Sequence, residues 1–273
     1  MGGSVSKAKI CILGDIAWGE KVSVSELSDD CFKVNSQETF LHLSGTIAEI
    51  LKARGHQVCV TSVLGKSGDT DEKIRSGLQA KGIDYIFTHD DSRRALVYRK
   101  IDNLDGGIQF WDGTTTDISE SVADEFYHGV LSVIRESDVV VLLDYGMGSL
   151  PIDLTKLVIS ECRSSDRPLV VLPCPGTRAE NLTGAKVVMC AKKDVPTVFQ
   201  DYQDGIPLFL SVFAIDKAVF WSVPDSISIH SKDAEVQLGP VLTDQKEIMC
   251  NIIEASAFKL EQSSFTIHCA RGS

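Results

Sequence analysis

The sequence predicts an α/β fold with a mainly parallel sheet, and three observations carry this prediction. Short apolar runs alternate with amphipathic segments from Lys9 onward, as in a sheet with right-handed crossover helices. The run Val139–Leu143 holds five apolar residues, which is typical of a strand buried on both faces. This strand ends at Asp144, and a Gly-x-Gly turn follows. Because ligands of open α/β sheets bind at the carboxyl ends of strands, Asp144 is expected at a functional edge.

The chain up to residue 88 alternates strand and helix. The first helix has apolar residues at helical spacing and ends at Gly55, and the second closes at Lys81-Gly82. The predicted elements are, in order, strand Lys9–Leu13, helix Leu43–Arg54, strand Gln57–Val63, helix Asp69–Ala80 and strand Asp84–Thr88.

Two hairpins interrupt this alternation and are expected to form a lid or an addition to the sheet edge. The first has strands over Ala95–Ile101 and Gly107–Trp111 around Asp105-Gly106, a good turn dipeptide. The second pairs Ala218–Trp221 with Ile227–His230. The other predicted elements are helix Ser121–Arg135, strand Asp138–Leu143, helix Ile152–Cys162, strand Leu169–Leu172, strand Val187–Cys190, helix Asp194–Asp201, strand Pro207–Phe213 and helix Thr243–Leu260.

Composition restricts the class of protein. The 273 residues are 43% hydrophobic and 24% charged, which suits one large α/β domain, alone or with a small appendage. The net charge of −11 argues against a nucleic-acid groove, and no apolar run approaches the roughly 18 residues of a transmembrane segment. Eight cysteines without a C-x-x-C pair fit the cytoplasm or another reducing compartment. The start Met1–Lys7 matches the N-myristoylation pattern at Gly2, which Gly/Ser-rich starts of other origin share.

Six short motifs, in the same order, resemble those of the ribokinase (PfkB) carbohydrate kinases. The resemblance covers nearly the whole chain, and its N-terminal third is most similar to the heptose-phosphate kinase branch. It implies one ribokinase-like domain over residues 1–273, a three-layer α/β/α sandwich with a small β-hairpin lid at about residues 93–112. It also implies ATP- and Mg²⁺-dependent phosphoryl transfer to a sugar or sugar-phosphate hydroxyl. The motifs are Ile12–Asp15, Ile47-Ala48 through Arg54-Gly55, Val63–Asp69, Gly82–Asp84, Asp144–Gly148 and Gly184-Ala185.

The resemblance places substrate contacts after the first strand and before the first helix. The family's aspartate at Asp15 binds a sugar hydroxyl; the alternative is a turn aspartate. The family's G-G-x-x-N segment, which lets the backbone approach the sugar, reads His42–Thr46 here. Gly45 is retained and Thr46 stands near the asparagine position, while His42 and Leu43 carry bulk.

Arginines on the first hairpin are a further candidate for substrate binding. Arg93, Arg94 and Arg99 lie there, and in the family a cation on this lid can meet a phosphate. Arg99 is therefore the implied substrate contact. The alternative is a solvated edge strand protected by charge.

The residues implied to bind nucleotide and metal follow two strands. The family's N-x-x-E segment, which orders magnesium and the nucleotide phosphates, reads Ala191–Asp194 here. Lys192 and Asp194 are the implied cofactor ligands, Asp194 is also the implied metal ligand, and Asp144 is a further cofactor-binding candidate. The alternative for the two lysines of this segment is a solvated helix start.

The family's D-T-x-G-A-G-D motif, which opens the long C-terminal helix, reads Leu238–Asp244 here. The spacing keeps Asp244 at the position of the catalytic base, with Thr243 beside the nucleotide phosphates. Val241, Leu242 and Thr243 replace the G-A-G of the anion hole, and such side chains resist the open turn that directs amides at a phosphate. The alternative is that Thr243 or Asp244 caps the helix.

Three functions stay open on the sequence alone. The first is the family's kinase reaction, with ATP and Mg²⁺ as cofactors and Asp244 as base. The second is a catalytically inactive pseudokinase that acts as a binding or scaffold protein, because four motifs that position phosphates or substrate are altered. The third is a different small-molecule activity in the same cleft. The lid hairpin has apolar residues on both faces, so one face is expected to cover the cleft and the other to contact a partner, in a homodimer or a hetero-complex.

Overall fold

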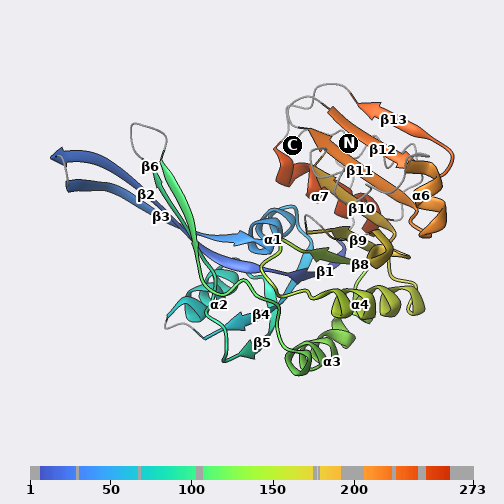
Figure 1. The fold of residues 1–273 in the computed structure, drawn as a ribbon, viewed down its shortest axis with the longest axis horizontal. Helices are drawn as coiled ribbons and strands as arrows, with labels where there is room; N and C mark the ends of the chain where they lie inside the picture. Colours follow the sequence, from blue (N-terminus) through green and yellow to red (C-terminus); the bar gives the residue numbers. More distant parts are fainter. Residues whose placement is uncertain are drawn as a thin grey trace.

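The computed structural model describes residues 7–28, 31–66, 69–102, 107–174, 177, 179–191, 206–222, 226–238 and 244–258. Within these ranges a nine-stranded sheet forms the centre of the molecule (Figure 1). Its order is β13-β12-β11-β10-β9-β8-β1-β4-β5, parallel throughout except for β12 and β13 at one edge. This confirms the predicted α/β class with a mainly parallel sheet. The strands are β1 (Lys9–Gly14), β4 (Gln57–Gly65), β5 (Asp84–Asp90), β8 (Val139–Leu143), β9 (Leu169–Leu172), β10 (Val187–Ala191), β11 (Lys217–Ser222), β12 (Ser226–Ser231) and β13 (Glu235–Leu238).

Helices cover both faces of this sheet, which makes three layers. Alternate strand residues point to opposite faces, so Ile10 and Ile12 of β1 share one core cluster with residues of α1, α2 and α7, whereas Cys11 and Leu13 share another with residues of α3, α4 and α6. None of the described helices is long and apolar enough to cross a membrane. The helices are α1 (Ser44–Ala53), α2 (Thr70–Ala80), α3 (Glu120–Glu136), α4 (Ile152–Ser164), α6 (Ile206–Val212) and α7 (Gln245–Ala257), with the 3-10 helix η1 at Ala179–Leu182.

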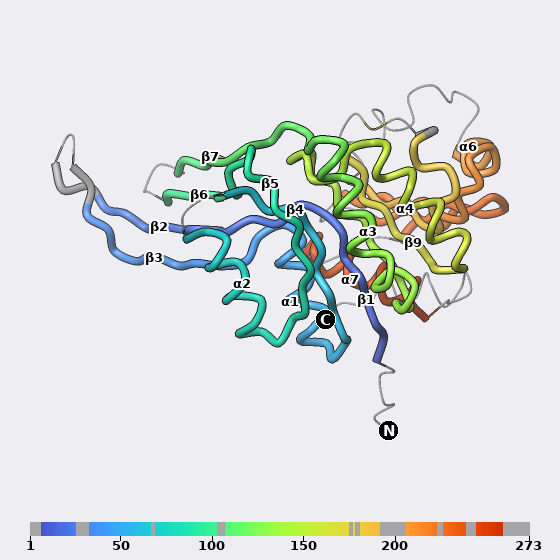
Figure 2. The backbone as a smooth tube through the Cα atoms, turned by 90° about the horizontal axis from the view of Figure 1, so that it is seen from below, coloured from blue at the N-terminus to red at the C-terminus, as the bar shows by residue number. Residues whose placement is uncertain are grey.

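A second sheet extends away from the layered body (Figures 1 and 2). In the described part of the chain it has four strands in the order β3-β2-β6-β7, namely β2 (Ile16–Ser28), β3 (Cys31–Leu43), β6 (Val97–Asp102) and β7 (Ile108–Asp112). The hairpin predicted as a lid, β6–β7, is therefore only half of this sheet, and its role as a lid stays a prediction. The other half is the long hairpin β2–β3, for which the sequence analysis assigned no structure, although the alternation from Trp18 to Val24 is typical of a half-buried strand.

The register of the second sheet divides its side chains between two faces, as the alternation in the first hairpin predicted. The face here called the cleft face carries Ala17, Gly19, Phe40, His42, Leu96, Tyr98, Lys100 and Trp111. The outer face carries Trp18, Glu20, Leu41, Val97, Arg99, Ile108, Phe110 and Asp112. The base of the outer face packs on α2, where Gly77 lies against Leu41 and Trp18.

One predicted element has the wrong type. Residues Pro207–Phe213 were expected to form a strand, but Ile206–Val212 is helix α6. A short apolar run does not distinguish a strand from a helix. Here burial follows the helix, because Phe209 and Leu210 are buried while Leu208 and Val212 are exposed.

The other predicted elements match within a few residues where the structure describes them. The second predicted hairpin is the antiparallel pair β11–β12, extended by β13. The helix predicted over Thr243–Leu260 is α7, and the one predicted from Leu43 begins at Ser44. The helix predicted over Asp194–Asp201 lies outside the described residues.

Candidate functional site

The candidate site lies where β1 and β8 end beside the base of the second sheet. Asp15 directly follows β1, and Asp144 directly follows the parallel neighbour β8. The turn from Tyr145 to Ser149 continues from Asp144 and contacts the cleft face through Tyr145 and Met147. The sequence prediction that Asp144 stands at this edge is therefore borne out by its position.

Asp15 holds this turn. Its carboxylate is fully buried and accepts hydrogen bonds from the backbone N–H groups of Tyr145 (3.0 Å), Met147 (3.2 Å) and Ser149 (3.1 Å). Three such bonds compensate much of the cost of burying this carboxylate, because hydrogen bonds to an ionised acceptor are stronger than neutral ones. These contacts are those of a turn aspartate, the alternative that the sequence left open, whereas the sugar contact of Asp15 stays a prediction.

Arg93 holds the same turn from the other side. Its buried guanidinium donates to the carbonyl oxygens of Met147 (2.7 Å) and Gly148 (3.4 Å). It also donates to those of Thr114 (3.0 Å) and Thr116, in the segment that follows β7. Burial lowers the pKa of Arg93 from its ordinary value, which nearby Asp15 partly offsets. Arg93 thus joins both ends of the first lid hairpin to the turn after β8, and the sequence analysis treated it only as a lid cation.

Asp144 is the partly exposed carboxylate of the site. Its oxygen accepts a hydrogen bond from the backbone N–H of Gly146 at 2.9 Å. Burial raises the pKa of Asp144 to about 6, and the charge of Asp15 acts in the same direction. A carboxyl group that titrates near neutral pH at a strand end is a candidate for proton transfer or for binding a cation. Its contact with a cofactor stays a prediction.

The segment before α1 differs from a glycine-rich loop in its backbone conformation and in how its side chains pack. Leu43 has φ +58° and ψ −123°, a conformation that L side chains rarely adopt. A Cβ on Gly45 would lie 2.8 Å from the Cβ of Leu41, so Gly45 permits close packing of α1 against β3. The hydroxyl of Thr46 donates to the carbonyl oxygen of Leu41 at 2.8 Å. The described contacts of Gly45 and Thr46 are thus with the protein itself, and their substrate contacts stay predictions.

The side chain of Leu43 packs where the second sheet meets the turn after β8. It is buried and packs with Ala17 and Leu96 of the cleft face and with Tyr145 and Met147 of the turn. We call these five residues the cleft-base cluster. A glycine at residue 43 would leave this place unfilled, whereas the leucine side chain completes an apolar cluster.

Arg99 lies on the outer face, opposite to the cleft. It forms ion pairs with Glu20 (2.9 Å) and Asp112 (3.0 Å), and its guanidinium lies over the ring of Phe110. The hydrogen bond with Asp112 raises the pKa of Arg99. These contacts are those of a charged edge strand, the alternative that the sequence left open, and the substrate contact predicted for Arg99 remains untested.

Asp244 caps α7. Its Oδ1 accepts a hydrogen bond from the backbone N–H of Lys246 at 2.7 Å, and its side chain is exposed. Burial, and to a smaller extent the charge of Lys246 in the first turn of α7, lower the pKa of His42 to about 4. The capping alternative therefore holds, and the role of Asp244 as a base stays a prediction. Lys192, Asp194 and Thr243 lie outside the described residues.

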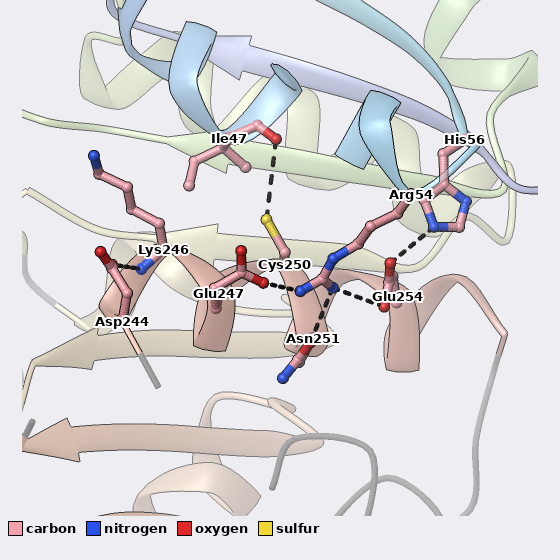
Figure 3. A network of polar contacts seen from close by, with 9 residues as sticks. All are labelled: Ile47, Arg54, His56, Asp244, Lys246, Glu247, Cys250, Asn251 and Glu254. Atoms are coloured by element: carbon pink, nitrogen blue, oxygen red, sulfur yellow. Dashed lines mark hydrogen bonds and ion pairs between the residues drawn. The ribbon is translucent and has the colours of Figure 1, made fainter. Parts of the chain in front are cut away.

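A polar network fixes α7 to α1 behind the site (Figure 3). Arg54 pairs with Glu247 and with Glu254 (3.0 Å), and it donates to Asn251 (2.9 Å). Glu254 also accepts from Nε2 of His56 at 2.9 Å, since Nδ1 of that ring accepts from the backbone N–H of Ala8. The network positions the helix that carries Asp244 and Lys246. Sequence reasoning missed it because its two halves are about 200 residues apart.

Among the described residues, no group of three or more His, Cys, Asp or Glu side chains could hold a metal ion. Asp15 is fully buried and accepts three backbone N–H bonds, whereas Asp144 is the partly exposed carboxylate of this strand end. Mg²⁺ in phosphoryl-transfer sites is usually held by one or two carboxylates together with waters and substrate phosphates, so Asp144 could supply one such ligand.

Searches of known proteins gave distant relatives by sequence and many by structure. No family model matches the chain. Two curated relatives are Bifunctional protein HldE from Sulfurimonas denitrificans, 24% identical over 193 residues, and from Desulfatibacillum aliphaticivorans, 24% identical over 197 residues. These matches cover 68% and 69% of this chain but only 40% of each relative, so the chain spans about two fifths of their length.

Solved structures share the fold over almost the whole chain. A carbohydrate kinase from Agrobacterium tumefaciens has a TM-score of 0.75 at 16% identity and matches over 96% of this chain and 88% of its own. Phosphofructokinase-2 from Escherichia coli, in complex with fructose-6-phosphate, has a TM-score of 0.76 at 11% identity, over 96% of this chain and 91% of its own. The chain therefore has the fold of the ribokinase-like (PfkB) carbohydrate kinases.

Proposed function

We propose that this protein is a carbohydrate kinase homologue that has lost phosphoryl transfer and acts as a binding or scaffold protein. In this proposal residues 1–273 form one domain, and the second sheet is its lid. The proposal rests mainly on the conformation and packing of Leu43. Leu43 keeps a backbone conformation suited to glycine, yet its side chain completes the cleft-base cluster where a sugar would approach the backbone.

The cofactor side of the cleft supports the same proposal. Phosphoryl transfer depends almost wholly on positioning and on electrostatic stabilisation of the phosphates. In the sequence, Val241–Thr243 replaces the glycines of the anion hole, and Lys192 and Asp194 are what remains of the metal motif. If ATP and Mg²⁺ bind, these two segments and Asp144 would hold them.

The alternative is a working sugar kinase. The exposed carboxylate of Asp244 at the N-terminus of α7, across from the lid, favours it, because a catalytic base has to reach the substrate hydroxyl. The substrate would be a sugar or a sugar phosphate, and its identity and the heptose-phosphate branch stay predictions.

Mg-ATP distinguishes the two functions. A ligand at 100 times its dissociation constant stabilises a protein by about 2.7 kcal/mol, which raises the melting temperature by several degrees. We expect millimolar Mg-ATP to leave the melting temperature of this protein unchanged in a thermal shift assay. The phosphofructokinase-2 of Escherichia coli serves as the assay control. A clear upward shift with Mg-ATP would contradict the pseudokinase proposal.

Assembly and location are proposals as well. Four large apolar side chains of the second sheet are exposed, namely Val34, Ile108, Phe110 and Trp111. Since Ile108 and Phe110 share the outer face, we propose that this face binds a second copy of the chain or another protein.

The proposals of a cytoplasmic or other reducing location and of myristoylation at Gly2 rest on the sequence alone. Gly2 lies outside the described residues.

A further inference from the structure

A cavity of about 310 Å³ lies at the edge of the main sheet opposite to the candidate site. It is formed where the parallel strands β1, β4 and β5 start, beside the last turn of α3. β1 runs from Lys9, in the lining of the cavity, to Gly14, just before Asp15, so the cavity and the candidate site are separate places. Sites for small molecules have volumes of roughly 300–1,000 Å³, and this cavity is within that range.

An apolar wall lines the cavity on the side of α3. Cys59 of β4 pairs in register with Asp84 of β5, and Ile86 follows Asp84 on the same face of the sheet. Val133 of α3 and Ile86 pack on the core cluster of that face, which contains Cys11, the register partner of Cys59. Cys59, Ile86 and Val133 all line the cavity and are only half-buried, so each leaves apolar surface uncovered there.

The charge around the cavity is mainly negative. Asp84 and Glu136 are exposed carboxylates of the lining, whereas Lys9 is the cation among the described residues that line it. α3 ends at Glu136, and the C-terminus of a helix carries a partial negative charge. The charge of Asp84 acts inside the cavity, because burial and then this charge raise the pKa of Cys59 to about 11.

Hydrogen bonds fix the corner between α3 and β1 that borders the cavity. The backbone N–H of Lys9 donates to the carboxylate of Asp138 at 2.8 Å, and the N–H of Asp138 donates to the carbonyl oxygen of Lys9 at 2.8 Å. The hydroxyl of Ser137 donates to the carbonyl oxygen of Val133 at 2.7 Å, and Arg167 donates to that of Ser137 at 3.2 Å. The cavity is thus formed before a ligand arrives, which lowers the cost of ordering on binding.

We propose that this cavity binds a small organic cation, namely an amine on an apolar body. A water molecule in the liquid takes up about 30 Å³, so the cavity has room for a body of about ten non-hydrogen atoms. The ammonium group would pair with Asp84 and Glu136, because hydrogen bonds between charged groups are the strong ones. The apolar body would contact Cys59, Ile86 and Val133. The proposal does not depend on the loss of phosphoryl transfer at the other edge of the sheet.

Ligand-observed NMR titration of the full chain with three probes tests the proposal. The probes are 2-phenylethylamine, 2-phenylethanol and phenylacetate, which have similar apolar bodies and a cationic, a neutral and an anionic head group. We expect the amine to bind roughly tenfold or more tightly than the other two. Asp84→Asn combined with Glu136→Gln should remove this preference. Glu125→Gln, at an exposed carboxylate of α3 away from the cavity, is the matched control and should change amine binding by less than about twofold.

Two further measurements place the amine in the cavity. Val133→Phe, which adds bulk to the apolar wall, should weaken amine binding by roughly tenfold, and circular dichroism shows whether this variant is folded. In the wild type, the amine should slow modification of Cys59 by methyl methanethiosulfonate, followed by mass spectrometry. This second measurement decides if the variant is unfolded.

Four results would overturn the proposal. They are no binding of the amine, equal binding of the three probes, tighter binding of phenylacetate, and amine binding that neither the double carboxylate variant nor the rate of Cys59 modification reflects. A response of the melting temperature to Mg-ATP, measured separately, would contradict the proposed function and leave this inference standing.

Discussion

Leu43 occupies a conformation that favours glycine, at the place where the family carries glycine. A residue held in such a sparsely populated backbone region costs of the order of 1–3 kcal/mol, and burial of a leucine side chain gains a similar amount. The chain thus keeps a strained backbone because the side chain completes the cleft-base cluster. The sequence shows a leucine in place of a glycine, but it does not show that the backbone of this leucine is strained.

Substitutions at Leu43 separate the cost of the strained backbone from the gain of the buried side chain. Both Leu43→Ala and Leu43→Gly lose the buried side chain, but only the glycine relieves the backbone. We expect Leu43→Gly to be more stable than Leu43→Ala by about 1 kcal/mol, measured by urea unfolding. At an ordinary site the order is reversed, as Leu51→Ala and Leu51→Gly within α1 should show. An alanine variant that is the more stable of the pair at residue 43 would mean that the backbone is not strained.

Asp144 makes the stability of the folded protein depend on pH, and its raised pKa gives the direction of this dependence. Its pKa is raised from 3.8 to about 6 in the folded protein, so the folded state binds the proton more tightly than the unfolded state does. The contribution of this group to stability therefore falls as pH rises from about 4 to about 6. We expect Asp144→Asn to melt close to the wild type at pH 4 and above it at pH 7. His42 has the opposite sign but is present in both proteins, so the difference in melting temperature isolates Asp144. A difference that does not change with pH would show that Asp144 is not buried in solution.

At the scale of elements, α1 and α7 depend on one another through charged side chains. The side chain of Glu254 is only 9% exposed, and Arg54 is one of its partners. Removing one member of a buried ion pair is far more costly than removing a pair at the surface, because the other charge stays desolvated.

Arg54→Met tests this dependence. We expect it to lower the free energy of unfolding by about 3 kcal/mol or more. The matched control is Arg135→Met, because Arg135 pairs with Glu161 at 2.7 Å but is 58% exposed, and its loss should cost less than about 1 kcal/mol. Equal losses in the two variants would mean that the network contributes no more than a surface pair.

At the scale of the whole molecule, the second sheet is too apolar to stand in water on both faces. The cleft face is partly covered by the turn after β8, and the outer face is covered by α2 only at its base. Ile108 is 61% exposed and Phe110 is 41% exposed beyond that base. Exposed apolar patches of this kind mark interaction surfaces.

We expect light scattering to give a mass above 29.7 kDa for the full chain at tens of micromolar. Ile108→Lys combined with Phe110→Lys should lower the mass to that of one chain, since charge on an apolar interface disfavours association. Ile152→Lys, at an equally exposed position on α4, is the control and should not change it. A wild-type monomer that recovers no partner in a pull-down would contradict the proposed assembly.

The sequence by itself determined the elements whose pattern is local. The apolar run of β8, the two faces of the first lid hairpin and the cap of α7 at Asp244 followed from spacing and residue type. Only the tertiary structure decided the pairing of β2 with β6, the helix at Ile206–Val212 and the partners of Asp15, which lie 130 to 134 residues away. Those features depend on contacts between distant segments, and a local pattern holds no information on which segment will meet which. The same reason explains the candidate site: residue types placed Asp15 and Asp144 at strand ends, but long-range packing decided that Asp15 holds the turn after β8 and that Leu43 packs against this turn.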